Sequence, residues 1–280
     1  MIDEWLTSYE CKTAYEVQHA KREILQYIAL SGLARSDFFD HASFYGGTAL
    51  RIIYGMQRFS EDIDFSLNEK NMNFSLENYF QYIEDECKLL NLAVSLAIKQ
   101  KVNPNAVESA FLKDNTEWNV ISFKDKKNGA EPEVKIKIEI DRNPPLNFKT
   151  EQKLLIKPYS FYVSVFREEY LFAGKMHALL FREWKSRVKG RDWYDMEWYI
   201  KRGSKLNLAH LETRAWESGH FSTGKRLTPD LFRELLIKKI NQLDIDGARF
   251  DVQRFIVNPI ELNIWSKQYF LDLTEKINIS

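Results

Sequence analysis

The sequence predicts an α+β fold in which a core with a small mixed sheet precedes a helical bundle. Segments that alternate in polarity like a β-strand are concentrated in residues 1–165, whereas from residue 166 onward almost every apolar pattern has helical spacing. A chain of 280 residues is also long enough for two domains of ordinary size. We therefore expect a mixed-sheet domain over residues 1–165 and a helical domain over residues 166–280.

The elements of the first domain follow from apolar spacing and from turn residues. The clearest strand covers residues 134–141, where Ile136, Ile138 and Ile140 alternate with charged residues, and Pro144 follows, which cannot continue a ladder. The predicted strands cover residues 43–45, 59–67, 118–123 and 134–141, and the predicted helices cover residues 13–32, 48–56 and 76–92.

The second domain is predicted to consist of helices alone. They cover residues 167–187, 192–201, 206–216, 229–243 and 259–277. Between the last two lies Asp244-Ile245-Asp246, which we interpret as a turn because Gly247 follows it.

The composition narrows the class of protein. Forty Lys and Arg balance forty Asp and Glu, so a nucleic-acid partner would need a local basic surface. Cys11 and Cys87 are too few and too far apart for a disulfide framework or a zinc site. The first residues lack a secretory signal pattern, and no apolar run is long enough to span a membrane. We expect a cytoplasmic protein with no membrane partner.

A glycine pair and two acidic residues form the most informative part of the chain. Gly46 and Gly47 open a predicted helix, where backbone N–H groups can approach a polyphosphate, and Thr48 adds a hydroxyl. Asp62 and Asp64 are two residues apart on a predicted strand and therefore share one face. Carboxylates suit Mg²⁺, and magnesium ions can clamp both sides of a transferring phosphoryl group.

Three further residues extend this predicted site. Arg58 and Ser60 precede the acidic pair and are candidate phosphate contacts. A third metal ligand is expected from the polar face of residues 134–141, where we prefer Glu139 because it lies inside the strand. Asp141, at the end of the strand, is the alternative, and ordinary surface charge is the other interpretation of this face.

A second group of candidate residues lies in the helical domain. Lys175 stands in an otherwise apolar stretch, where an unpaired charge would be costly, so we expect it to meet a carboxylate or to open onto a cleft. Asp192 begins the next predicted helix, where an acidic residue also favours the helix dipole. Spacing alone does not separate structural pairing from function for either residue.

Four separated blocks resemble the AbiEii/AbiGii toxin nucleotidyltransferases. They lie within residues 44–199 and read Gly46-Gly47-Thr48-Ala49-Leu50-Arg51, Arg58-Phe59-Ser60-Glu61-Asp62-Ile63-Asp64-Phe65, Lys175 with Ala178-Leu179, and Arg191-Asp192-Trp193-Tyr194-Asp195. The resemblance implies a DNA-polymerase-β-like nucleotidyltransferase core followed by a helical domain that lines the cleft. By the same resemblance Asp62 and Asp64 bind the catalytic metal, Gly46, Gly47 and Thr48 hold the triphosphate, and Lys175 and Asp192 are needed for activity.

The function implied by this resemblance is a magnesium-dependent transfer of a nucleoside monophosphate from an NTP to an acceptor. The family suggests tRNA as acceptor and the role of a toxin in a bacterial toxin–antitoxin or phage-defence system, with a cognate antitoxin as a possible partner. Two alternatives stay open: the same core acting on a protein or small molecule, and a non-catalytic binding module that retains the fold.

A local excess of positive charge lies beside these blocks. The short stretch from residue 182 to residue 191 contains five basic residues and a single acidic one, Glu183. The basic residues are Arg182, Lys185, Arg187, Lys189 and Arg191. Such a stretch can neutralise RNA phosphates, although a solvated turn explains it slightly better. Trp184 and Trp193 could stack on bases, but tryptophan at helical spacing more often belongs to a core.

Overall fold

The computed structural model describes residues 2–98, 107–114, 134–182 and 188–280, which form two compact units. The first unit comprises Met1–Gly55, Phe59–Pro144 and Glu151–Val165, and the second comprises Met56–Arg58, Pro145–Thr150 and Phe166–Ser280. The main division falls at Val165, but two short segments from earlier in the chain belong to the second unit.

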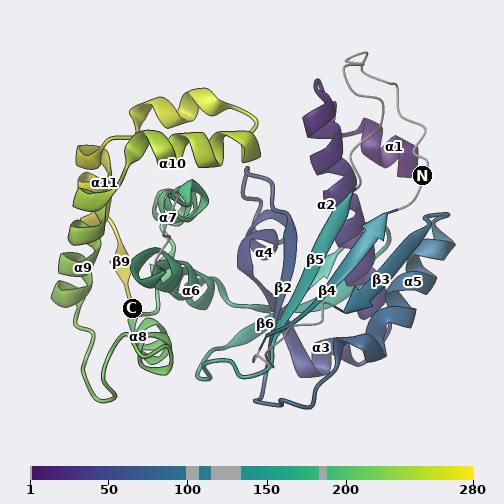
Figure 1. The fold of residues 1–280 in the computed structure, drawn as a ribbon, viewed down its shortest axis with the longest axis horizontal. Helices are drawn as coiled ribbons and strands as arrows, with labels where there is room; N and C mark the ends of the chain where they lie inside the picture. Colours follow the sequence, from purple (N-terminus) through teal and green to yellow (C-terminus); the bar gives the residue numbers. More distant parts are fainter. Residues whose placement is uncertain (1, 99–106, 115–133, 183–187) are drawn as a thin grey trace. The chain divides into compact units, whose positions relative to one another are not determined.

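The first unit is built on a seven-stranded mixed sheet with the strand order β3-β4-β5-β2-β1-β7-β6 (Figure 1). β2 pairs in parallel with β5 and β1 in parallel with β7, whereas the pairs β1–β2, β3–β4 and β4–β5 are antiparallel. The strands are β1 (Ala42–Tyr45), β2 (Asp62–Leu67), β3 (Val94–Ile98), β4 (Val107–Asp114), β5 (Lys135–Asp141), β6 (Thr150–Leu155) and β7 (Phe161–Phe166).

The alternation of β2 and β5 gives the middle of this sheet one apolar face and one polar face. Ile63 and Phe65 of β2 are fully buried, as are Ile136 and Ile138 of β5. The residues between them on both strands are polar, and those paired across the two strands remain half-buried. Side chains alternate along a strand, so the burial of the apolar set turns the polar set to the other face.

The apolar face is covered by helices α2 (Ala14–Leu33) and α5 (Phe80–Leu89), which pack against each other (Figure 1). The Thr13 side chain accepts the Glu16 N–H at the start of α2, and the two residues form a capping box. A Cβ at Gly32 would lie 2.7 Å from the Tyr82 carbonyl oxygen, so a glycine permits the close approach of the two helices. The other helices of the first unit are α1 (Ile2–Thr7), α3 (Phe38–His41), α4 (Gly46–Ile52) and η1 (Leu76–Tyr79).

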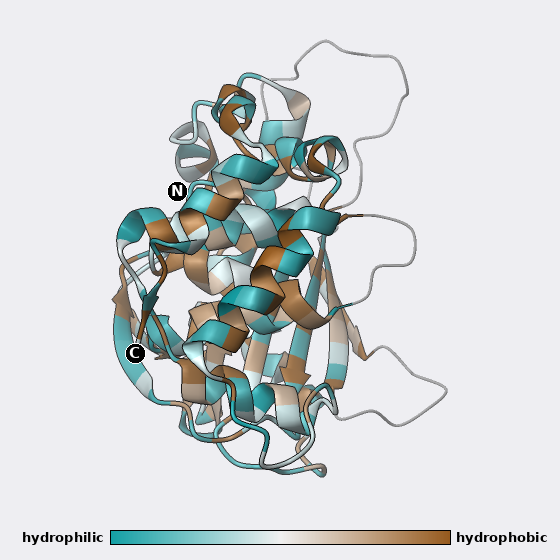
Figure 2. Cartoon of the chain, turned by 90° about the vertical axis from the view of Figure 1, so that its left-hand side faces the viewer, coloured by the Kyte–Doolittle hydropathy of each residue, from teal (hydrophilic) through white to brown (hydrophobic). Residues whose placement is uncertain are grey.

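The second unit is a bundle of helices, and Figure 2 shows its helices with hydrophilic and hydrophobic residues on different sides. α6 packs against α7 and α8, α10 against α7, and α11 against α9. β8 (Lys205–Leu206) and β9 (Asn278–Ile279) form a parallel pair. The helices are α6 (Glu168–Phe181), α7 (Gly190–Arg202), α8 (Leu208–Glu217), α9 (Pro229–Gln242), α10 (Ile245–Val252), η2 (Gln253–Phe255), η3 (Pro259–Ile264) and α11 (Lys267–Thr274).

The predicted fold class, a mixed-sheet core with C-terminal helices, is confirmed. The predicted turn at Asp244 is wrong: its side chain accepts the Gly247 N–H, so Asp244 caps α10. The helix predicted over 259–277 is divided, because Ser266 caps a separate α11. Strands β3, β4, β6 and β7 were not predicted, and the strand predicted over residues 118–123 lies outside the described residues.

Candidate active site

The glycine pair lies where β1 ends and α4 begins. Gly46 lies next to Asp64, another residue of the predicted site. Gly46 has φ of +82°, a conformation that side chains other than glycine rarely adopt. A Cβ at Gly46 would overlap the Asp64 Oδ2 atom. Gly46 is therefore required twice, by its own backbone and by the carboxylate against it, and the glycine turn and Asp64 form one site.

The strand register brings the predicted acidic residues onto one face. Asp64 pairs with Tyr45 on β1 and with Glu139 on β5, and Asp62 lies two residues earlier on β2. Asp62, Asp64 and Glu139 are all half-buried, in contrast to the fully buried Ile63 between the two aspartates. The sheet thus places the carboxylates beside the glycine turn.

Glu139 is held by its own neighbours. Lys137 Nζ lies 2.6 Å from Glu139 Oε1, and the Ser109 hydroxyl donates to the same oxygen at 3.0 Å. Asp141, the alternative, pairs with Ser66, one further step along the face from Asp64. Within the described ranges no three His, Cys, Asp or Glu side chains are gathered as a metal site. The role of Glu139 as a third metal ligand stays a prediction, and in this structure Lys137 and Ser109 contact its carboxylate.

Two carboxylates remain that fit a magnesium ion. Asp62 and Asp64 offer hard oxygen ligands from the same face of one strand, and a metal that retains several waters needs only one or two such carboxylates. The space that a Cβ of Gly46 would fill is occupied by the Asp64 carboxylate, which fixes that carboxylate next to the turn. The donor set accordingly matches the chemistry that the sequence predicts.

The other predicted phosphate contacts are placed less directly. Thr48 is fully buried, and its hydroxyl donates to the backbone carbonyl of Asp62, which fastens α4 to β2. The Ser60 carbonyl accepts a hydrogen bond of 3.1 Å from Gln26 Nε2 of α2. Both residues position the turn and the strand, and direct contacts of their hydroxyls with a phosphate stay predictions.

Arg58 belongs to the second unit and is only 2% exposed. Its Nε and Nη2 donate to the two carboxylate oxygens of Asp195, at 2.6 and 2.7 Å. Burial alone would lower the pKa of the guanidinium, but the charge of Asp195 raises it above its usual value. The structure gives Arg58 a carboxylate partner in the interior of the second unit, and its contact with a phosphate stays a prediction.

Lys175 meets carboxylates, one of the two outcomes that its sequence context allowed. Its Nζ lies 2.7 Å from Asp195 Oδ2 and 3.8 Å from Asp192 Oδ1. Burial would raise the pKa of Asp195, but the positive charges of Arg58 and Lys175 and their hydrogen bonds hold it at about 2. Asp195 is therefore a fully charged residue shared by two cations.

Asp195 was quoted in the sequence only as part of a block and not singled out as a site residue. Its position supplies a signal that could have identified it: Asp192 and Asp195 are three residues apart on α7 and therefore share a helix face. Nothing local in the sequence, however, connects Asp195 to Arg58, which lies 137 residues earlier.

The comparison with protein families shows the family of the chain. The family described as "Nucleotidyl transferase AbiEii toxin, Type IV TA system" matches residues 28–260. The chain belongs to the AbiEii family. It is accordingly a nucleotidyltransferase toxin of the toxin–antitoxin class, and the sequence-based resemblance is confirmed.

Three solved structures are similar to this chain in fold. A structure described as a putative nucleotidyltransferase from H. pylori is 20% identical, with a TM-score of 0.52, and the match covers 92% of each chain. JHP933 from Helicobacter pylori is 19% identical, with a TM-score of 0.54, over 92% of this chain and 90% of that one. MenT4, a nucleotidyltransferase toxin from Mycobacterium tuberculosis H37Rv, is 15% identical, with a TM-score of 0.52, over 98% and 94%.

Two further findings accompany the family assignment. The search among curated proteins gives no match. In the described part of the chain, no helix combines the length and the apolar character that crossing a membrane requires.

Proposed function

We propose that this AbiEii-family nucleotidyltransferase uses magnesium to move a nucleoside monophosphate from an NTP to a tRNA. The observation that supports it best is the contact between Gly46 and the Asp64 carboxylate, which joins a phosphate-binding turn to a metal-binding strand. The tRNA acceptor rests on the family resemblance of the four sequence blocks.

The proposal gives each group of the first unit a separate task. Gly46 and Gly47 present backbone to the triphosphate, and Thr48 anchors the turn to β2 through the Asp62 carbonyl. Asp62 and Asp64 would hold magnesium, which stabilises the charge on the attacking and leaving oxygens when bound. Lys137 contacts Glu139, which pairs with Asp64 across the two strands.

The resemblance also assigns Lys175 and Asp192 a part in activity. The structure adds a reason to test Lys175 with care, because the lysine also compensates the buried charge of Asp195. Loss of activity on replacing Lys175 therefore counts only if thermal unfolding is unchanged.

The test is a labelling reaction with purified protein, magnesium, total tRNA and each of the four α-labelled NTPs in turn. We expect label in tRNA with the wild type and none with Asp62→Ala or Asp64→Ala. Asp246→Ala is the matched control, because Asp246 lies in the duplicate Asp-Ile-Asp tripeptide and its side chain is 91% exposed.

Each possible failure points to a different conclusion. Label in a protein or in a small molecule would replace the tRNA acceptor by that class. Full labelling in the presence of a chelator would contradict the magnesium requirement. Full labelling by Asp62→Ala would contradict the assignment of the site itself.

A further inference from the structure

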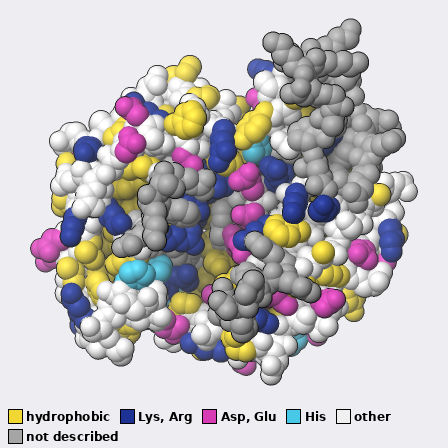
Figure 3. All heavy atoms as spheres, in the orientation of Figure 1, with side chains coloured by type: hydrophobic (Ala, Val, Ile, Leu, Met, Phe, Trp, Pro, Cys, Tyr) yellow, Lys and Arg dark blue, Asp and Glu magenta, His cyan; other side chains and the backbone are white. Residues whose placement is uncertain are grey.

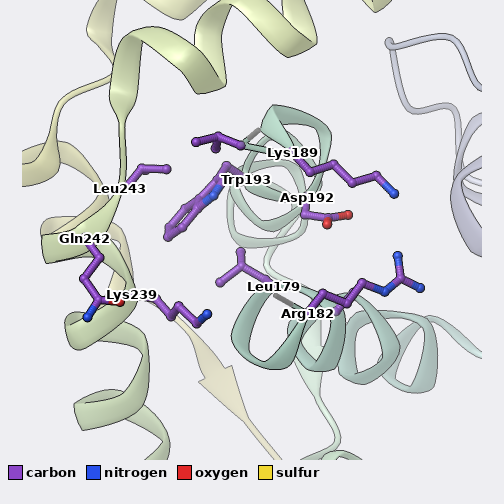
Figure 4. Close-up of a pocket in the computed structure, with 10 residues that line it drawn as sticks. Leu179, Arg182, Lys189, Asp192, Trp193, Lys239, Gln242 and Leu243 are labelled. Atoms are coloured by element: carbon purple, nitrogen blue, oxygen red, sulfur yellow. The ribbon is translucent and has the colours of Figure 1, made fainter. Parts of the chain in front are cut away.

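The second unit contains a pocket of about 200 Å³, and Asp192 is the one lining residue to which the proposed function already assigns a part in activity (Figure 4). It lies among the end of α6, the start of α7 and the end of α9. The lining residues are Ala178, Leu179, Arg182, Val188, Lys189, Asp192, Trp193, Lys239, Gln242 and Leu243.

The pocket is positively charged on two sides. Figure 4 shows Arg182 and Lys189 on the same side as the Asp192 carboxylate, whereas Lys239 extends from α9 on the opposite wall. On the face drawn in Figure 3, Lys and Arg side chains gather around hydrophobic side chains in this part of the second unit. Three cations against one carboxylate favour an anionic ligand.

Lys189 carries a further sign that an anion would be stabilised here. Burial lowers its pKa to about 8, Asp192 counteracts this, and the neighbouring charges of Lys175, Arg182 and Arg191 lower it further. A bound anion would relieve the repulsion among these cations.

The Asp192 carboxylate indicates a second feature of the ligand. Its side chain is almost completely buried, and Asp192 Oδ1 has no hydrogen-bond partner within the described residues, while Lys175 Nζ lies 3.8 Å from it. A buried acceptor without a donor is costly. A ligand that brings a hydroxyl or amine donor to this oxygen would satisfy it.

The remaining walls are apolar. Trp193 is buried and packs edge-on against Phe270, at 5.1 Å between ring centroids, and Leu179 and Leu243 complete the apolar surface. The volume is below the roughly 300–1,000 Å³ of pockets that enclose a drug-sized ligand. A phosphate with its ribose fits these limits better than a whole nucleoside triphosphate.

We infer that this pocket binds one nucleotide of an RNA strand, with its phosphate between the three cations and a ribose hydroxyl donating to Asp192. A ribose hydroxyl is the group by which a protein distinguishes RNA from DNA. This inference rests on the proposed function, since it names where the acceptor RNA is held.

The first test measures binding and needs no catalysis. A fluorescein-labelled RNA tetranucleotide and the DNA of the same sequence are each titrated with the Lys239→Gln protein and with the Lys238→Gln protein. Lys238→Gln is the control, because Lys238 is a neighbouring exposed lysine that does not line the pocket. We expect Lys239→Gln to weaken RNA binding about 3- to 10-fold and to reduce the salt slope by about 0.7, as for one lost contact to a single strand. Equal effects of both variants would overturn the inference.

The second test addresses the hydroxyl. Asp192→Ala is expected to lose the preference of the wild type for RNA over DNA, with thermal unfolding measured in parallel. Retention of the full preference by a folded Asp192→Ala protein would contradict the contact. If this variant does not fold, the comparison of RNA with DNA on the wild type decides, because equal affinities would overturn the role of Asp192.

Kinetics separate this inference from the proposed function. In the tRNA labelling reaction we expect Lys239→Gln to raise the KM for tRNA about 3- to 10-fold while kcat and the KM for NTP stay unchanged. If wild-type protein labels no RNA but the binding results hold, the proposed acceptor fails and the pocket stands. If labelling occurs and Lys239→Gln changes only the KM for NTP, the pocket binds the donor and the inference fails.

Discussion

The chain holds its charged side chains in two different ways. In the first unit Asp62 and Asp64 lie half-buried on one strand face, next to a glycine turn. In the second unit Arg58 and Lys175 come from separate segments and both pair with the buried carboxylate of Asp195. The first arrangement keeps its carboxylates partly exposed, whereas the second buries its carboxylate against two cations. We therefore expect the first to control activity and the second to control stability.

The strongest test of this contrast replaces the carboxylates of the first unit. Asp62→Asn or Asp64→Asn is expected to reduce nucleotide transfer at least about a thousandfold, because metal ions supply several kcal/mol of charge stabilisation. The melting temperature is expected to stay within about 2 °C of the wild type. A variant that keeps a tenth of the activity, or that unfolds, would break the contrast.

Removal of Arg58 is expected to act on stability instead. Arg58→Ala leaves the buried Asp195 with Lys175 alone, and breaking a buried pair costs about 3–5 kcal/mol. Urea unfolding measures this loss. Arg233→Ala is the control, because its partner Asp230 is 92% exposed and exposed pairs contribute about 0–1 kcal/mol. Equal losses for the two variants would show that the cluster does not stabilise the unit.

Lowering the pH is expected to reduce the stability that the same cluster contributes, by a smaller amount. The pKa of Asp195 is about 2 in the folded protein and 3.8 ordinarily, so its stabilising effect is complete above pH 4 and is lost as the pH falls through 2. A shift of this size corresponds to about 2 kcal/mol. Thermal unfolding between pH 5 and 2 measures it, and Asp195→Asn is expected to show a correspondingly flatter dependence. The same slope in both proteins would remove Asp195 as the cause.

A modest stability change is expected in the first unit, at its glycine turn. Gly46→Ala and Gly55→Ala both place a side chain at a positive φ, which costs about 1–2 kcal/mol each. Only the Cβ at position 46 would overlap the Asp64 carboxylate, since nothing lies within 4 Å of one at position 55. We expect activity to fall tenfold or more for Gly46→Ala alone. Similar activity of the two variants would show that the glycine turn and the Asp64 carboxylate do not act as one site.

Much of the first site was predictable because its causes are local. The alternation around Ile63 set the face of the two aspartates, and the glycine pair preceded them in the chain. The preference for Glu139 over Asp141 agrees with the register, which pairs Glu139 with Asp64. The contact of Lys137 with Glu139 was not predicted, because residues two apart on a strand give no indication of which charges will meet.

The second cluster was not predictable in the same way. Arg58 lies in a block that resembles a phosphate-binding segment, and only tertiary structure connects it with Asp195. Strand β6 was missed because Glu151, Gln152 and Lys153 interrupt its apolar pattern, and α10 because a capping aspartate before a short helix resembles a turn. Of the basic stretch, Arg191 stacks on Phe255 at 4.1 Å, while Lys185, Arg187 and Trp184 lie outside the described residues.

The membership of Met56–Arg58 in the second unit has a consequence for how the protein can be made and divided. A fragment starting at residue 166 would lack Arg58 and would carry Asp195 with one cation fewer. During synthesis Arg58 leaves the ribosome long before Asp195, so this ion pair cannot close until α7 has been translated. The helical unit is therefore not encoded by one continuous segment, and a gene cut at residue 166 would yield it without one cation of its buried ion pairs.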